Sequence, residues 1–314
     1  MFEDVNCKIV ALATIVVATM AAPAAGRGQQ VPDTAFVGPS FTPAFAANRG
    51  PLVVIDQAHN NFHTASGRYS PFAKFLRRDG FRVEGLSREF TTESLKPVSV
   101  LVIANALASQ NVNRWIAPTP SAFTTAEIAA VREWVRGGGG LLLIADHMPF
   151  AGAAHDLARE FGIDVINGFA LGEPGNVGQL TFRRSDSTLR AGPITDGRAS
   201  SERVDSVTTF TGNAFRALNE SASPILVFGS GVEVLTTDTA WVFDDKTGRQ
   251  SAVGLLQGAA VQFGAGRVMI AGEAALFSAQ VTGPARRPMG MNAPGAEQNP
   301  QFLLNIMHWL TRLY

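Results

Sequence analysis

The sequence predicts an α/β fold built on a doubly wound, mainly parallel sheet with a β-rich insertion. Short apolar runs that suit strands buried on both faces alternate with segments of helical periodicity through residues 51–161. Three of these runs end in a polar residue, at Asp56, Asn105 and Asp146. From residue 168 to about residue 264 the pattern changes to short β-rich segments separated by Gly, Asp or Ser, which predict an antiparallel extension.

The first half of the folded region reads as alternating strands and helices. Ser70 can cap a helix that ends at Asp79-Gly80, and Thr124 with Glu127 forms a capping box that begins another helix. A run of four glycines at residues 137–140 ends that second helix and leads into an apolar strand. The predicted strands are residues 51–56, 81–86, 98–104, 141–145 and 163–166, and the predicted helices are residues 70–79, 124–136 and 153–161.

The second half is predicted to return to the main sheet through a hairpin. Its strands are residues 252–256 and 267–271, with a turn at residues 264–266, and Glu273 follows the second strand. The terminal segment at residues 300–313 has apolar side chains on one face, which predicts a helix packed on the sheet. Within the β-rich region, the candidate strands are residues 179–182, 204–210, 224–228 and 240–243.

The N-terminal region has the pattern of a secretory signal. Lys8 precedes an apolar run, and small residues predict cleavage near Ala24 or Ala25, so we expect a signal peptide at residues 1–25 and a secreted or periplasmic protein. An uncleaved signal anchor is the alternative, and it is the only membrane association we expect. Residues 26–50 lack periodicity and read as a linker with little order, followed by one domain at residues 51–314.

Composition excludes several classes of function. Lys+Arg and Asp+Glu both number 26, and no long basic run is present to neutralise a phosphate backbone, so we expect no nucleic-acid partner. The sequence has no Gly-x-Ser-x-Gly turn of an α/β-hydrolase, and it has neither a Walker loop nor a Gly-x-Gly-x-x-Gly after the first strand. The sequence therefore predicts no bound nucleotide cofactor. Its composition does not indicate an oligomeric state.

Acids and imidazoles gather at the predicted carboxyl ends of strands, where open α/β sheets bind ligands. As catalytic candidates we take Asp56, Asp146, His147 and Glu273. His59 and His63 are four residues apart, so on a helical turn they would share a face, as two ligands of one metal ion must. The expected metal ligands are His59, His63, His147 and Asp146, and a divalent ion such as Zn²⁺ held there would activate water for hydrolysis.

Each of these residues also has an ordinary structural interpretation. Acids at strand ends commonly cap turns, histidines in loops hydrogen-bond to the backbone, and Glu273 can anchor the start of a helix. His155 and His308 are expected to serve packing or capping within helices. The loop at residues 286–295 could cover the site after Glu273 or form an exposed connection, and the exposed connection is favoured.

The chain resembles the class I glutamine amidotransferase-like superfamily, whose fold is flavodoxin-like, and within it proteins that carry the domain known as DUF4350. The resemblance covers roughly residues 51–313. It depends on four segments: Val-Ile-Asp-Gln-Ala-His-Asn-Asn at 54–61, the strand at 140–146, the hairpin that ends in Gly-Glu at 272–273, and Asn-Pro-Gln-Phe-Leu-Leu-Asn at 299–305 followed by His-Trp.

That resemblance implies a fold but no glutaminase activity. True amidotransferases place a nucleophilic cysteine in a Gly-x-Cys-x-Gly turn after the strand that corresponds to residues 141–145, whereas here the turn carries Asp146 and His147. We therefore expect an exported amidotransferase-like protein that binds a small polar ligand, either carbohydrate-like or peptide-like, with metal-assisted hydrolysis as its candidate activity. The alternative is a non-catalytic envelope binding or scaffold domain that uses residues 168–264 as its contact surface.

Overall fold

The structure is a computed structural model that describes residues 30–172 and 178–314. The expected signal peptide lies outside these residues. Within them, no helix has both the length and the apolar character needed to cross a membrane.

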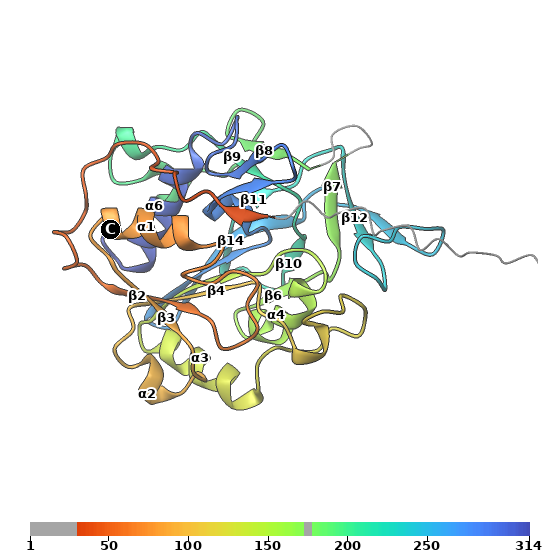
Figure 1. The fold of residues 1–314 in the computed structure, drawn as a ribbon, viewed down its shortest axis with the longest axis horizontal. Helices are drawn as coiled ribbons and strands as arrows, with labels where there is room; N and C mark the ends of the chain where they lie inside the picture. The colour runs from red at the N-terminus through yellow and green to blue at the C-terminus, as the bar shows by residue number, and fades with distance from the viewer. Residues whose placement is uncertain (1–29, 173–177) are drawn as a thin grey trace, which may run out of the picture.

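A nine-stranded sheet forms the centre of the molecule (Figure 1). Its strands follow the order β3-β2-β4-β5-β15-β14-β10-β6, and β11 also pairs with β14. The strands are β2 (Leu52–Asp56), β3 (Arg82–Leu86), β4 (Val100–Ala104), β5 (Gly140–Ile144), β6 (Ile163–Val165), β10 (Phe215–Ala217), β11 (Ala222–Val227), β14 (Leu256–Phe263) and β15 (Gly266–Ala271).

The register of the sheet fixes where its strands end. Strands β4, β5 and β15 are parallel neighbours, and Ala104, Ile144 and Ala271 lie side by side at their carboxyl ends. Residues of β5 alternate between the two faces, so that Leu142 belongs to one hydrophobic cluster and Leu143 to the other. Every residue of β2, β4 and β5 is buried, which is what an apolar run covered on both faces requires.

Helices cover both faces of this central region. Helices α1 and α6 lie on one face, and α2, α3 and α4 lie on the other (Figure 1). The Thr124–Glu127 capping box at the start of α3 is confirmed, as are a helix from Ser70 and a terminal helix. The helices are α1 (Ser70–Arg78), α2 (Thr92–Leu95), α3 (Thr125–Arg136), α4 (Phe150–Arg159), α5 (Pro193–Asp196) and α6 (Asn299–Leu310), with 3₁₀ turns η1 (Ser109–Asn111), η2 (Ser200–Glu202) and η3 (Ala275–Phe277).

The predicted fold class, a doubly wound and mainly parallel α/β sheet of flavodoxin-like type, is wrong. The protein is β-rich, with only about 21% helix. Among the described strands, four pairings are parallel and nine are antiparallel. Alternation of strands and helices in the first half predicted a mainly parallel sheet, with antiparallel strands expected only in the β-rich extension and the returning hairpin. However, β6 pairs antiparallel with β10, and the strands from β14 onward add mainly antiparallel ladders.

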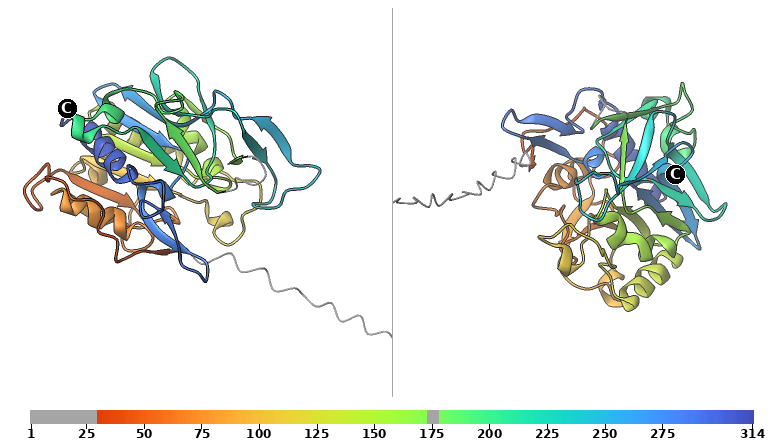
Figure 2. Two further views of the ribbon diagram at one scale, coloured as in Figure 1. Left: turned by 90° about the horizontal axis from the view of Figure 1, so that it is seen from above. Right: turned by 90° about the vertical axis from the view of Figure 1, so that its right-hand side faces the viewer.

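Three smaller sheets surround the central one. The first has the order β1-β16-β17, the second β13-β12-β7, and the third pairs β8 with β9. The β12–β13 hairpin projects from the body of the molecule (Figure 2). Their strands are β1 (Val31–Pro32), β7 (Phe169–Gly172), β8 (Leu180–Arg183), β9 (Ser206–Thr209), β12 (Val232–Thr236), β13 (Gly248–Ser251), β16 (Ala279–Thr282) and β17 (Arg287–Gly290).

Residues 30–50 are packed on the domain rather than loosely ordered as expected for a linker. Strand β1 pairs antiparallel with β16, so this segment completes a sheet. Phe36, Phe41 and Phe45 pack against the hydrophobic core. The aromatic side chains supply the buried contact area that a flexible linker lacks.

The β14–β15 hairpin should tolerate no side chain at Gly266. A Cβ there would meet the carbonyl oxygens of Val135 and Gly139, so the end of α3 would have to move. We expect Gly266→Ala to lower the free energy of unfolding by about 2 kcal/mol or more, measured by denaturant titration. Gly192→Ala is the control, because a Cβ at Gly192 meets no atom within 4 Å. Equal stability of the two variants would contradict the packing described for the hairpin.

Candidate functional site

Polar residues lie at or just beyond the carboxyl ends of four neighbouring strands in the order β2-β4-β5-β15. They are Asp56, Asn105, Asp146 and Glu273, and all but Asp146 are buried to within about 1% exposure. The side-chain Oδ1 of Asn105 accepts a hydrogen bond from the backbone N–H of Asp146 at 2.9 Å. This hydrogen bond links the segments that follow β4 and β5, just beyond the last residues of the two strands.

Asp56 and His59 belong to a separate buried cluster. The Nδ1 of His59 lies 2.9 Å from a carboxylate oxygen of Asp56, and its Nε2 lies 2.8 Å from Oε1 of Glu127. Glu127 in turn accepts hydrogen bonds from the N–H and hydroxyl of Thr124. This imidazole therefore fastens the loop after β2 to the beginning of α3. Its role is structural, but it is buried between two carboxylates and does not bond to backbone groups of an exposed loop, as the ordinary interpretation expected.

The charges of this cluster are mutually stabilising. Burial of the imidazole opposes protonation of His59, but its hydrogen bonds and charge interactions with Asp56 and Glu127 outweigh that effect and raise its pKa. For Glu127, burial acts in the opposite direction, yet the hydrogen bonds from Thr124 and His59 lower its pKa. Folding therefore favours the protonated histidine and the ionised glutamate more than the unfolded chain does.

His63 faces a different environment, beside a cavity. Its ring stacks on Tyr69 with centroids 4.7 Å apart, and its Nδ1 has no hydrogen-bond partner among the described residues. Burial and, to a lesser extent, the charge of Arg68 lower the pKa of His63 to about 3. His63 is therefore neutral at physiological pH.

Asp146 and His147 lie at the edge of the same cavity. Oδ1 of Asp146 accepts the backbone N–H of His147 at 2.7 Å, and the imidazole Nδ1 of His147 donates to the carbonyl of Met148 at 2.6 Å. The side-chain amide of Asn213 donates to the backbone carbonyl of Asp146 at 3.1 Å. The backbone of Asp146 is therefore held from two sides, while its carboxylate lines the cavity.

Glu273 mainly serves the backbone. Its two carboxylate oxygens accept the N–H groups of Ala275 and Leu276, at 2.7 and 2.8 Å, at the start of η3. Burial, together with the negative charge of Asp146, raises the pKa of Glu273 to about 8, although those backbone hydrogen bonds act in the other direction. Glu273 therefore holds its proton at neutral pH more readily than an ordinary carboxyl group does.

The predicted metal site is not assembled. His59 is enclosed by two carboxylates away from the cavity, whereas His63, Asp146 and His147 line the cavity, where His147 directs its Nδ1 to a backbone carbonyl. No group of three or more His, Cys, Asp or Glu side chains within residues 30–172 and 178–314 has a geometry that could hold a metal ion. The spacing of His59 and His63 suggested a shared helical face, but both lie in an irregular loop before α1 and point to different partners.

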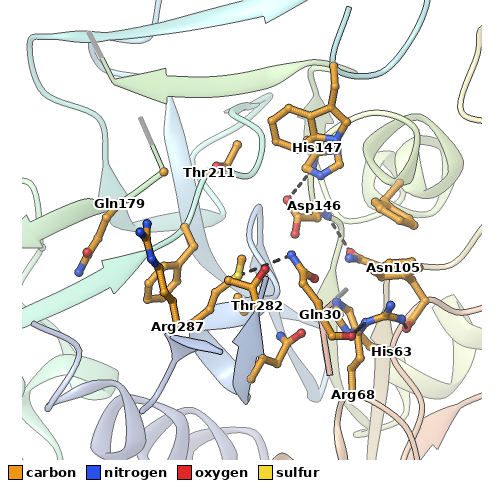
Figure 3. Close-up of a pocket in the computed structure, with 18 of the residues that line it drawn as sticks. Gln30, His63, Arg68, Asn105, Asp146, His147, Gln179, Thr211, Thr282 and Arg287 are labelled. Carbon is orange, nitrogen blue, oxygen red and sulfur yellow. Dashed lines mark hydrogen bonds between the residues drawn. The ribbon is translucent and has the colours of Figure 1, made fainter. Parts of the chain in front are cut away.

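The cavity has a volume of about 790 Å³ and opens at the carboxyl ends of β4 and β5 (Figure 3). In Figure 3, Asp146 lies between His147 and Asn105, whereas His63, Arg68 and Gln30 gather nearby. Arg287 and Gln179 lie on the opposite side of the view. The lining is formed by Gln30, Phe62, His63, Arg68, Asn105, Trp115, Asp146, His147, Phe150, Gly178, Gln179, Phe210, Thr211, Trp241, Ala275, Gln280, Thr282, Arg287, Pro288 and Met289.

One wall of the cavity is aromatic. Trp115 contacts the rings of Phe62 and Phe150, with centroids 5.5 and 5.1 Å apart. Trp241 lies edge-on to His147 at 4.8 Å and is 39% exposed. The aromatic wall, defined by Phe62, Trp115, Phe150 and Trp241, offers a flat apolar surface.

The facing wall is the small sheet β1-β16-β17, which sequence reasoning missed. Gln280 lies opposite Met289, and Thr282 lies opposite Arg287, so these four side chains share one face of the sheet. Sequence reasoning favoured an exposed loop for residues 286–295, but Arg287 lines the cavity. The signal that could have located this wall is the polar–apolar alternation of β16, where Gln280 and Thr282 alternate with the buried residues Ala279 and Val281.

Backbone strain gathers around the cavity. Asn105, Thr211 and Trp241 all line it, and all have positive φ angles of 53°, 98° and 66°. Asn accepts this conformation readily, but Thr and Trp rarely do. Strained residues persist where the surrounding structure holds them, often at binding sites. This clustering supports a functional role for the cavity.

The Asp56–His59–Glu127 cluster predicts a pH-dependent contribution to stability. The pKa of His59 is raised on folding, so its contribution is complete below the ordinary value near 6.5 and is lost as pH rises through the raised value. We expect His59→Ala to lower the free energy of unfolding by about 3 kcal/mol at pH 6 and by less at pH 9, measured by denaturant titration. His155→Ala, at a half-buried histidine on α4, should cost less than about 1 kcal/mol. An equal loss of unfolding free energy in the two variants would contradict a stabilising role for the Asp56–His59–Glu127 cluster.

Comparison with known proteins gives similarity of fold only. No model of a known protein family matches the chain, and no curated protein matches its sequence. The structure of the mmIFT52 N-terminal domain superimposes with a TM-score of 0.57 at 16% identity, over 82% of this chain and 97% of that domain. A ThuA-like protein from Bacteroides uniformis aligns with a TM-score of 0.45 at 13% identity, over 86% of this chain and 95% of the other. The chain therefore shares its fold with the mmIFT52 domain.

Proposed function

We propose that the protein binds a small carbohydrate-like ligand in the cavity beside Asp146. The observation that carries the proposal is the combination of an aromatic wall and a polar sheet face across one cavity of about 790 Å³. A volume of that size suits a ligand of one or a few sugar rings. The strained backbone at Thr211 and Trp241 supports the same location.

A sugar ring matches the chemistry of both walls. One face of a pyranose presents C–H bonds that pack on an aromatic ring, while its rim presents hydroxyl groups that both donate and accept hydrogen bonds. Trp115 and Trp241 supply the rings, and Asp146, Asn105 and Gln280 supply acceptors and amide donors. A purely apolar ligand would leave these polar groups without partners, which is costly in a buried site.

Binding agrees better with the site than the expected metal-assisted hydrolysis does. Of the six residues chosen from the sequence, Asp56 and His59 are used by the cluster with Glu127, and Glu273 caps η3. Only His63, Asp146 and His147 line the cavity. His63 is neutral, and the imidazole of His147 donates its Nδ1 proton to a backbone carbonyl. The residues that remain suit recognition of a ligand.

The resemblance to amidotransferase-like proteins enters this proposal only in part. Asp146 follows β5, where a true amidotransferase would carry its cysteine, so we infer an amidotransferase-like protein without glutaminase activity. Export through the N-terminal segment is part of the same proposal and depends on residues outside the described structure. Detection of the protein in a periplasmic or secreted fraction, cleaved near Ala24 or Ala25, would test it.

A scaffold role for residues 168–264 is the second candidate. The segment between β12 and β13 exposes Val242 at 50% and Trp241 at 39% of their surfaces, on a projection from the body of the molecule (Figure 2). Scattered exposed apolar residues are normal, however, and Trp241 also lines the cavity. The cavity therefore offers the better-defined binding surface.

Removal of the exposed indole at position 241 should weaken ligand binding. We expect Trp241→Ala to raise the Kd for the bound sugar about tenfold, which corresponds to the loss of one stacking contact and its buried area. Trp241→Phe keeps an aromatic ring and should raise the Kd by less. Isothermal titration against a panel of monosaccharides and disaccharides measures both variants beside the wild-type protein. Failure of every sugar in the panel to bind the wild-type protein would overturn the proposed function.

A further inference from the structure

Two guanidinium groups in the cavity have no carboxylate partner in the part of the chain that the structure describes. Arg68 and Arg287 both line the cavity, and neither forms an ion pair there. Asp146 is the one carboxylate among the described lining residues. The described residues that line the cavity therefore carry more positive than negative charge.

Arg68 is held in place but not neutralised. Its Nε donates to the carbonyl of Gln30 at 3.1 Å, and its Nη1 donates to the carbonyl of Phe62 at 3.2 Å. The guanidinium carbon lies 3.8 Å from the centre of the Phe62 ring. Arg68 is half-buried, and burial lowers its pKa, although arginine remains protonated at any physiological pH. An anion in the cavity would meet an oriented cation whose Nη2 has no hydrogen-bond partner among the described residues.

Gln280 is unusual because its whole amide group lacks partners. It is fully buried, and neither its Nε2 nor its Oε1 has a hydrogen-bond partner among the described residues. Gln280 shares the cavity-facing side of β16 with Thr282, and it lies opposite Met289 on β17. A buried amide without partners destabilises the folded protein, so its presence at a cavity wall indicates a ligand group that completes its hydrogen bonds.

Gln30 connects Arg68 to the wall that contains Gln280. The backbone carbonyl of Gln30 accepts from Arg68, and its side-chain amide donates to the Sδ of Met289 at 3.5 Å. Figure 3 shows Gln30 close to both Arg68 and His63. The buried Nδ1 of His63 also has no partner there. A cation, an unpartnered amide and an unpartnered imidazole nitrogen thus line the same cavity.

We propose that this cavity recognises an acidic sugar, whose carboxylate is bound by Arg68 and Gln280 while its ring packs on the aromatic wall. The inference rests on the proposed function and specifies its ligand. The carboxylate accepts from the guanidinium Nη2 and from the amide Nε2, and a ring hydroxyl donates to Oε1 of Gln280. Arg287, an exposed residue on β17, adds a second positive charge opposite Thr282.

Charge favours a carboxylate over a phosphate. Two guanidinium groups against the carboxylate of Asp146 leave one excess positive charge among the described lining residues, which matches an anion of charge −1. His63 adds no charge because it is neutral. A phosphate monoester carries close to two negative charges at neutral pH and would exceed the available positive charge.

The test compares matched neutral and acidic sugars on the intact protein. By isothermal titration at low ionic strength, we expect D-glucuronate or D-galacturonate to bind about tenfold tighter than D-glucose or D-galactose, with the preference weakening at high salt. Glucose 6-phosphate should bind less tightly than glucuronate. Tighter binding of the phosphate ester, or equal binding of acidic and neutral sugars, would overturn the acidic-sugar inference and leave the proposed function standing. Binding of none of these sugars would overturn both.

Gln280→Met separates recognition from folding. Methionine has a similar shape and no amide, so the variant should melt at the same temperature as the wild-type protein or higher, while its preference for glucuronate over glucose should fall severalfold. Gln262→Met, at an exposed position of β14, is the matched control and should change neither property. A second variant, Arg287→Gln, should reduce the preference without loss of stability. A lower melting temperature and an unchanged preference in Gln280→Met would identify Gln280 as structural and overturn the inference.

Discussion

Strand β5 is the constraint on which the candidate site depends, because it is paired in parallel on both sides and buried on both faces. Its neighbours β4 and β15 end in register with it, so Asn105, Asp146 and the segment that carries Glu273 reach one edge of the sheet together. The hydrogen bond from Asp146 N–H to Asn105 then fixes the first turn beyond the strands. The cavity is therefore built outward from a rigid edge, which is an effective way to hold a recognition site.

The polar groups near this edge form two sets, one that stabilises the fold and one that lines the cavity. The cluster of Asp56, His59 and Glu127 satisfies its own charges and ties a loop to the beginning of α3. The cavity groups are less completely satisfied: Arg68 has no carboxylate partner within the described residues, and the amide of Gln280 has no partner there at all. Buried polar groups that complete one another stabilise a fold, whereas unsatisfied ones indicate a ligand.

The sequence predicted the local pieces of this arrangement better than their assembly. Apolar runs that end in Asp56 and Asp146 identified β2 and β5, because a strand buried on both faces needs such a run. The role of His59 could not be predicted, because its partner Glu127 is 68 residues away and also belongs to a capping box. The wall formed by β1, β16 and β17 was missed because β1 has two residues in a segment without periodicity. The prediction of the fold class was wrong for a related reason, because short antiparallel strands show only weak periodicity in the sequence.

The four tryptophans of the chain offer a direct test of where the ligand binds. Trp115 and Trp241 line the cavity, whereas Trp134 lies on α3 and Trp309 on α6. In a ¹H–¹⁵N spectrum titrated with D-glucuronate, the indole N–H signals of Trp115 and Trp241 should shift, and those of Trp134 and Trp309 should not. Shifts confined to Trp134 or Trp309, or no shift of any indole signal at saturating ligand, would contradict a sugar site in this cavity.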